Sequence, residues 1–124
     1  MIYSKQRELV LDALCKAGQM HPTADMLYAD IRAAFPTISL ATVYRNLNQF
    51  ADAGQIARVR IPGCADRFDA VNDGHQHMLC TECGKVVDIP ASALPDICGA
   101  AQSATHLHID SCKLMLYGRC EGCE

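Results

Sequence analysis

The stretch that decides the fold is His75-Gln76-His77-Met78-Leu79-Cys80-Thr81-Glu82-Cys83-Gly84-Lys85-Val86-Val87-Asp88. It places two kinds of metal-binding chemistry side by side. His75 and His77 offer imidazole nitrogens of borderline softness, Cys80 and Cys83 offer soft thiolates, and Asp88 offers a hard carboxylate oxygen. Because these ligand types prefer different ions, the stretch predicts that two different metal sites meet here.

The second Cys-x-x-Cys pair lies near the end of the chain. Each pair can chelate one side of a tetrahedral ion, and four thiolates suit a structural Zn²⁺. The alternative is a pair of redox motifs, but a thioredoxin-like motif would open a helix in a βαβ unit, a setting that neither pair has. The sequence therefore favours one structural zinc site formed by Cys80, Cys83, Cys120 and Cys123.

The other cysteines are predicted to be thiols. The chain begins without the apolar segment of a secretory signal, so a cytoplasmic location is expected, where metal binding takes precedence over disulfides. Cys15 and Cys98 fall in helical patterns and are expected to be small core residues. The sequence assigns no role to Cys64 or Cys112. No apolar run approaches the length of a membrane span.

The His-x-His pair is the second candidate metal site. Residues two apart on a strand point to the same side, so His75 and His77 can reach one ion while Gln76 points away. Asp69 and Asp88 flank the pair, and imidazoles with carboxylates suit Fe²⁺, Mn²⁺, Zn²⁺ or Ni²⁺. The alternative is that both histidines are surface residues, or only support the zinc ligands.

Three short helices are predicted in the first half of the chain, over 4–17, 23–35 and 40–53. Apolar positions recur at helical spacing in each, and Thr23 and Ser39 can cap the second and third. This arrangement is typical of a helix-turn-helix. The polar face of the third helix would then recognise DNA, although an ordinary solvated face would have the same pattern. The residues expected on this face or its flank are Thr42, Tyr44, Arg45, Asn46, Asn48 and Gln49.

A β-wing is predicted directly after the third helix. Residues 55–61 alternate apolar and polar, Pro62-Gly63 turns the chain, and 67–69 fits a returning strand. Arg58, Arg60 and Arg67 lie on this wing and suit phosphate contacts. A winged helix strengthens the prediction, made from the helices, that DNA is the partner.

The overall fold class expected is α+β. Residues 1–70 would form a winged helix-turn-helix DNA-binding domain, and 75–124 an α/β dimerisation and metal-binding domain, with a hinge at 71–74. Strands are predicted over 85–89, 107–110 and 113–117, and a helix over 91–104. Half of the 124 residues are apolar, but domains of this size are marginal alone and need a metal or a partner chain.

The distribution of charge supports the same division. Residues 1–73 carry eight basic and eight acidic side chains, whereas residues 74–124 carry three basic and six acidic ones. The net charge of −3 argues only weakly against nucleic acid, because nearly all of the arginine lies in the first half.

Taken together, these motifs resemble the ferric uptake regulator (Fur) family over essentially the whole chain. They are 21–28 (HPTADMLY), 38–47 (ISLATVYRNL), 54–56 (GQI), 67–69 (RFD), 75–88 and 116–120 (LYGRC). The resemblance implies a homodimeric, metal-dependent repressor that binds an operator in double-stranded DNA and is not an enzyme. It also implies a structural Zn²⁺ on the four cysteines and a regulatory Fe²⁺ or Mn²⁺ on His21, Asp69, His75, His77 and Asp88.

Two residues point to one branch of this family. Iron-sensing members commonly have glutamate at the two carboxylate positions, whereas the peroxide-sensing PerR branch has aspartate, as at Asp69 and Asp88. In that branch, Fe²⁺ reduces peroxide and the nearby imidazoles of His21 and His75 are oxidised, while Mn²⁺ fills the site without this reaction. An iron-level or zinc-level sensor is the alternative within the family, although Cys64 is offset from the cysteine position of zinc sensors.

Two alternatives of other classes are a Cys-x-x-Cys thiol oxidoreductase and a zinc-ribbon or metal-buffering module. A further metal site known in some family members cannot form here, because its matching positions are Gly74, Gln76, Pro95 and Cys112. His106 and His108 also alternate, but no carboxylate pattern accompanies them, so they are expected to face solvent. The sequence does not specify the operator or the regulated genes.

Overall fold

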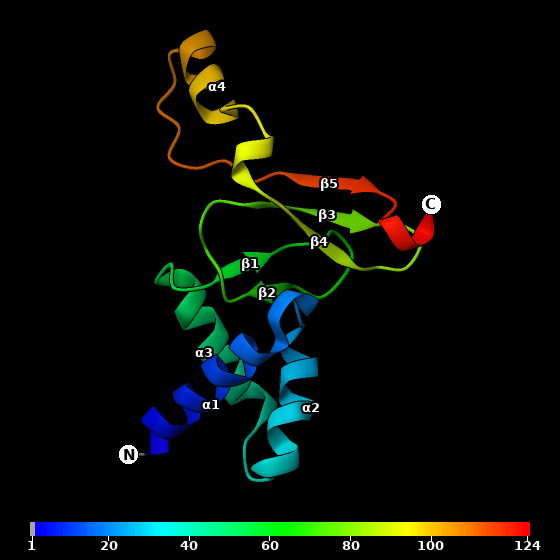
Figure 1. Ribbon diagram of the computed structural model, residues 1–124. Coiled ribbons are helices and arrows are strands. Elements are labelled where there is room, and N and C mark those ends of the chain that lie inside the picture. Colours follow the sequence, from blue (N-terminus) through cyan, green and yellow to red (C-terminus); the bar gives the residue numbers. More distant parts are fainter. Residues whose placement is uncertain (1) are drawn as a thin grey trace. The chain divides into compact units, whose positions relative to one another are not determined.

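The chain forms two compact units, Met1–Asp73 and Gly74–Glu124. In this computed structural model, residues 2–124 are described, together with all of their side chains except those of 2–4 and 19. Figure 1 shows the order of the elements along the chain. The first unit contains α1 (Ile2–Ala17), η1 (Gly18–Met20), α2 (Ala24–Ala34), α3 (Leu40–Asp52), β1 (Ala57–Val59) and β2 (Arg67–Asp69).

The three helices of the first unit pack around one apolar core. Leu14 of α1, Leu27 of α2 and Leu47 of α3 are each almost fully buried, and Phe68 of β2 joins them. Both predicted caps are present, since the Thr23 hydroxyl accepts from the Met26 N–H at 3.2 Å and that of Ser39 accepts from Thr42 at 3.1 Å. The periodic apolar positions and the caps therefore specify this bundle.

One face of α3 differs from its prediction. Thr42 and Asn46 were expected to point outward, but both are buried. The Asn46 amide donates to the Thr42 carbonyl at 2.9 Å, and the Thr42 and Ser39 hydroxyls are 2.8 Å apart. Local hydrogen bonds satisfy these polar groups and let them lie at the edge of the core.

The wing is present as a two-stranded antiparallel sheet. Ala57 pairs with Asp69 and Val59 with Arg67. A single bridge between Thr23 and Arg67 attaches this sheet to the start of α2. The register thereby places the chain around residue 21 beside the end of β2.

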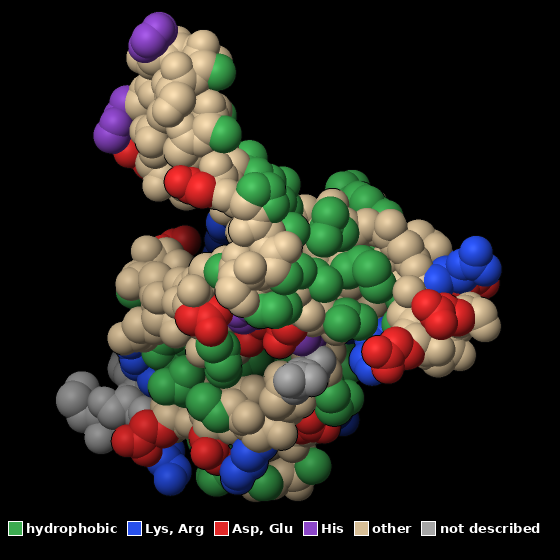
Figure 2. Space-filling model, turned by 45° about the horizontal axis from the view of Figure 1, so that its top comes forward, with side chains coloured by type: hydrophobic (Ala, Val, Ile, Leu, Met, Phe, Trp, Pro, Cys, Tyr) green, Lys and Arg blue, Asp and Glu red, His purple; other side chains and the backbone are tan. Residues whose placement is uncertain are grey.

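The second unit is built around a three-stranded sheet of order β4-β3-β5. Strand β3 is antiparallel to β4 and parallel to β5. Figure 2 shows hydrophobic side chains gathered over this sheet. The elements of the unit are β3 (Gln76–Cys80), β4 (Val86–Ile89), η2 (Ala91–Ala93), α4 (Ile97–Thr105), β5 (Met115–Gly118) and η3 (Glu121–Cys123).

Two predictions for this unit need correction. The helix expected over 91–104 is divided into η2 and α4, because the chain around Pro95 cannot continue a helix and Asp96 caps a new one. The strand expected over 107–110 is wrong, since 106–114 has no regular structure in the described chain. The α+β fold class, with helices first and a sheet beside a cysteine cluster second, is confirmed.

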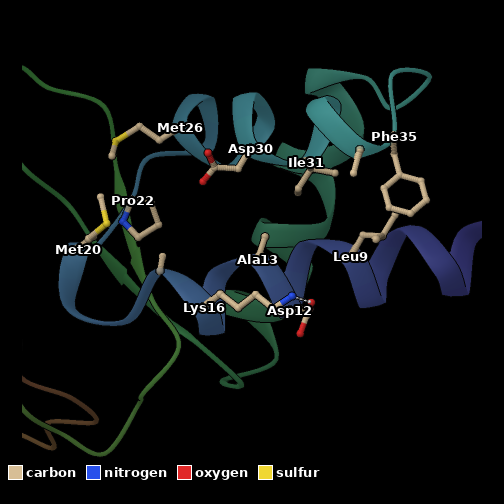
Figure 3. A pocket seen from close by; sticks show the side chains of 12 residues that line it. Leu9, Asp12, Ala13, Lys16, Met20, Pro22, Met26, Asp30, Ile31 and Phe35 are labelled. Carbon is tan, nitrogen blue, oxygen red and sulfur yellow. Dashed lines mark ion pairs between the residues drawn. The ribbon is translucent and has the colours of Figure 1, made fainter.

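A pocket of about 360 Å³ lies between α1 and α2. Figure 3 shows Ala13, Ile31 and Phe35 among its mainly apolar lining, with the Lys16–Asp12 ion pair (2.9 Å) at its side. It contains none of the predicted metal or DNA residues. Among the helices described, none is long and apolar enough to cross a membrane.

Candidate metal centres

Parallel pairing of β3 with β5 brings the two Cys-x-x-Cys motifs together. Cys80 ends β3 directly opposite Gly118 of β5, so Cys83 in the next turn and Cys120 beyond β5 lie at one edge of the sheet. The sulfur atoms of Cys80, Cys83, Cys120 and Cys123 all lie within 4.8 Å of one another. The predicted cysteine cluster therefore forms within the second unit.

Backbone hydrogen bonds shape this cluster before any ion is considered. Gly84, at φ 77°, closes the first turn by donating to the Cys80 carbonyl at 2.9 Å. The N–H groups of Cys83 and Cys120 point at the Cys80 sulfur from 3.5 and 3.4 Å. These donors lower the pKa of the Cys80 thiol to about 6, which favours the thiolate that metals bind.

The donor set fits Zn²⁺. Four sulfurs held at about 2.3 Å from one tetrahedral ion lie about 3.8 Å apart. The Cys83 and Cys120 sulfurs are 3.7 Å apart. Hydrogen bonding to Cys120 and to the other thiols of the cluster raises the pKa of Cys123 to about 12, so without a cation the cluster retains a proton there. A bound divalent cation would replace that proton and balance the thiolate charge.

The His-x-His pair and Asp88 form a second group in the same unit. His77 is paired with Asp88 across β3 and β4. Its Nε2 lies 3.4 Å from Asp88 Oδ1, and His75 Nε2 lies 3.2 Å from the same oxygen. The two rings are 4.6 Å apart, while Gln76 bonds instead to the Leu114 N–H at 2.8 Å. The alternation predicted for this strand is confirmed.

The first unit contains a matching but smaller group. His21 Nε2 lies 3.1 Å from Asp69 Oδ2, and both side chains are buried. The Val71 N–H donates to the other carboxylate oxygen at 2.9 Å, which fixes the orientation of Asp69. An imidazole and a carboxylate pair of this kind can supply two ligands to a divalent transition metal.

His21 occupies a strained backbone conformation. Its φ of 49° and ψ of 67° are left-handed, which costs a non-glycine residue of order 1–3 kcal/mol. Two contacts hold it there. Arg67 Nη1 donates to the His21 carbonyl at 3.2 Å, and the Phe68 N–H donates to Pro22 at 2.9 Å. His21 precedes Pro22, and a residue before proline avoids the right-handed helix. The sequence did not reveal that Arg67 positions this histidine.

The predicted DNA-contacting residues differ in accessibility. Tyr44, Arg45 and Arg60 are exposed. The Arg58 side chain is only 15% exposed, donates to Asn48 at 2.9 Å and lies 3.7 Å from Asp52. Arg58 therefore ties the wing to α3, in addition to any role at a phosphate.

The cysteines outside the cluster also need correction. Cys15 is exposed and is not a core residue. Cys98 forms a disulfide with Cys112, so the prediction of thiols is wrong for this pair. Disulfide connectivity cannot be deduced from sequence alone, and no motif marks these two residues. His106 and His108 are exposed as expected, and Figure 2 shows histidine side chains at the surface of the α4 segment.

Comparison with known proteins shows the family to which the chain belongs. The profile of the ferric uptake regulator family matches residues 1–117. The chain belongs to the ferric uptake regulator family. Members of this family are transcriptional regulators and not enzymes, and they bind DNA and dimerise. The cysteine cluster and the histidine–aspartate groups provide what such a regulator needs for structural zinc and for a regulatory metal.

Two curated relatives are similar to the chain over nearly its whole length. The chain is 35% identical over 119 residues to the peroxide-responsive repressor PerR of Staphylococcus saprophyticus, covering 96% of this chain and 80% of that protein. It is also 35% identical over 118 residues to the peroxide operon regulator of Bacillus subtilis, covering 95% and 81%.

Solved structures show the same fold. The peroxide stress regulator of Campylobacter jejuni superposes with a TM-score of 0.80 at 28% identity, covering 98% of this chain and 90% of that one. The Helicobacter pylori ferric uptake regulator reaches 0.81 at 22% identity, covering 96% and 79%, which supports the fold alone.

Proposed function

We propose that this member of the ferric uptake regulator family is a metal-dependent repressor that senses peroxide. The observation that carries the proposal is the pairing of imidazoles with aspartate in both units: His21 with Asp69, and His75 and His77 with Asp88. The 35% identity to a peroxide-responsive repressor supports the same branch.

The regulatory metal in this proposal is shared by the two units. His21 and Asp69 from the first unit and His75, His77 and Asp88 from the second would hold one Fe²⁺ or Mn²⁺, whose ligand preferences match this nitrogen and oxygen set. A shared ion stabilises one arrangement of the units by its higher affinity for that arrangement. The four cysteines would hold Zn²⁺ regardless of the oxidant level.

We propose a separate role for each of the two domains. Residues 1–70 would bind DNA and 75–124 would dimerise, with 71–74 as the hinge between them. Two chains of a cytoplasmic homodimer would then present two α3 helices at the spacing of the operator half-sites. The exposed Tyr44 and Arg45 would contact bases or backbone, and Arg60 would contact phosphate. Thr42 and Asn46, being buried, would shape α3 from within.

Peroxide sensing depends on which side chains lie against the ion. A bound Fe²⁺ would activate hydrogen peroxide toward the neighbouring side chains. One peroxide oxygen would be added to a ligand imidazole, the imidazole would supply the two electrons, and the other oxygen would leave as water. We assign that role to His21 and His75. Arg67 holds the backbone carbonyl of His21, and the His21 ring lies 3.1 Å from Asp69, so both contacts favour the position seen. Oxidation of His21 would remove a ligand that the DNA-binding unit supplies. Metal affinity and operator affinity then fall together.

The test is mass spectrometry of the Fe²⁺-loaded protein after a short peroxide pulse. The expected result is one added oxygen atom on His21 or His75, together with release from operator DNA. Protein loaded with Mn²⁺ is the matched control and should remain unoxidised and bound. If neither histidine gains oxygen while a chelator alone releases DNA, the chain senses iron level and not peroxide.

A further inference from the structure

The disulfide between Cys98 and Cys112 lies outside both metal centres. Cys98 is in the first turn of α4, and Cys112 lies in the irregular segment before β5. Their Cα atoms are 5.8 Å apart, a separation that a disulfide spans without backbone movement. Neither residue belongs to the zinc cluster or to the histidine–aspartate groups.

Helix α4 has few other attachments. None of its residues is buried in the described chain. Its N-cap bond, from the Gly99 N–H to Asp96, is local. The Gln102 side chain accepts from the Ile109 N–H at 2.8 Å, which ties the helix only to the loop that follows it. The disulfide is therefore the covalent link that holds α4 to the chain entering β5.

The Cys112 side of this link is bonded to β3, the strand that contains His77 and follows His75. Gln76 of β3 donates to the Cys112 carbonyl at 3.5 Å and accepts from the Leu114 N–H at 2.8 Å. Gln76 stands between His75 and His77 in the chain. Gln76 and the backbone pairing of β3 with β5 therefore both join the segment around Cys112 to β3.

Cys98 and Cys112 line a pocket at the surface of the second unit. Both cysteines are only partly buried, and the pocket has a volume of about 300 Å³. Leu94, Pro95 and Gln76 also line this pocket. A pocket of this size admits a molecule as small as hydrogen peroxide.

We propose that Cys98 and Cys112 form a reversible dithiol–disulfide site that responds to hydrogen peroxide independently of the regulatory metal. In a reducing compartment the pair would rest as thiols. One thiolate would attack peroxide, forming a sulfenic acid and releasing hydroxide. The second thiolate would attack that sulfur and displace the oxygen as a second hydroxide. The two thiol protons convert both hydroxides to water, so two electrons pass from the thiols to one peroxide.

The reverse reaction needs a dithiol reductant. Its thiolate would attack one sulfur of the disulfide, and its second thiol would resolve the mixed disulfide, leaving two cysteine thiols and an oxidised reductant. Oxidation fastens α4 to the segment before β5, and reduction releases it. The site is therefore a thiol modification site that controls the order of α4.

The experiment uses full-length, zinc-loaded protein without Fe²⁺, so that histidine oxidation cannot occur. The protein is reduced, treated with hydrogen peroxide, and digested without reductant for mass spectrometry. The expected product is a peptide pair joined by Cys98 and Cys112, which a dithiol reverses. Hydrogen exchange of the α4 amides should slow by about tenfold or more in the oxidised protein, because the cross-link restricts the loop that it closes.

Cys98→Ser and Cys112→Ser should each abolish the linked peptide, and either variant serves if the other folds poorly. Cys64→Ser, at an exposed cysteine outside the pair, is the matched control and should leave both the link and the exchange unchanged. The proposal is overturned if peroxide joins cysteines of the zinc cluster first, or if the link forms without slowing exchange in α4. Because iron is absent, failure of the peroxide-sensing proposal would not alter this result.

Discussion

Arg67 illustrates how one side chain can support a metal site by bonding the backbone of a ligand residue and not its ligand atom. It was predicted to meet phosphate, yet its guanidinium holds the backbone carbonyl of His21. Arg67→Ala should weaken Mn²⁺ binding by about tenfold, because the strained His21 loses a support that orients a ligand. Calorimetric titration measures this affinity. Arg60→Ala is the matched control: it should leave metal affinity unchanged and weaken only DNA binding. Equal metal affinity in both variants would contradict the positioning role.

Asp88 is the carboxylate that His75, directly before β3, and His77, within β3, share. Asp88→Asn keeps the shape of the side chain but removes its charge, so Mn²⁺ affinity should fall by about 100-fold or more if this residue is a ligand. Asp110→Asn offers a matched control, because Asp110 also pairs with a histidine, His108, at 2.9 Å, but on an exposed surface. Titration of the two variants side by side would contradict the assignment if their affinities were alike.

At the scale of single elements, α3 depends on its N-cap. The Ser39 hydroxyl satisfies the Thr42 N–H, so Ser39→Ala should lower the free energy of unfolding of the first unit by about 1 kcal/mol. Urea denaturation followed by circular dichroism measures the loss. Thr37→Ala, two residues earlier and exposed, should change it by less than about 0.5 kcal/mol. A Ser39 variant as stable as the Thr37 variant would mean that this cap is dispensable.

The helices and strands also show which parts of the fold could be predicted from the sequence and which could not. Helix periodicity and caps predicted α1, α2 and α3. Alternation over 55–61 predicted the strand that contains β1, and the returning strand expected at 67–69 is β2. Periodicity could not decide the border of the buried face, so Thr42 and Asn46 were misplaced. Residues 107–110 alternate like a strand, but a strand requires a neighbour, and the described chain provides none there.

Of the cysteine sites, the cluster could be predicted from the sequence and the disulfide could not. Spacing was enough for the cysteine cluster, because a Cys-x-x-Cys pair is a local chelate and only the two pairs had to meet. The Cys98–Cys112 link joins a helix to a loop through tertiary packing, which no local pattern records.

At the scale of the whole molecule, the two units differ in what stabilises them. The first has a continuous apolar core drawn from three helices and β2. Only Cys80, Val86 and His77 are buried in the second, within the described chain. A unit with so small a core depends on cross-links or on a partner chain. Its cysteine cluster joins the turn after β3 to the end of the chain after β5.

Removing zinc should therefore unfold the second unit while leaving the first intact. Treatment with a strong chelator under reducing conditions should abolish the slow hydrogen exchange of β3, β4 and β5, since free energy of zinc binding is free energy of folding in small domains. Exchange in α1, α2 and α3 should change little. A weaker chelator that removes only the regulatory ion is the matched control and should leave both units folded. If both units lose protection together after zinc removal, they fold as one cooperative body, and the metal stabilises more than the sheet that holds it.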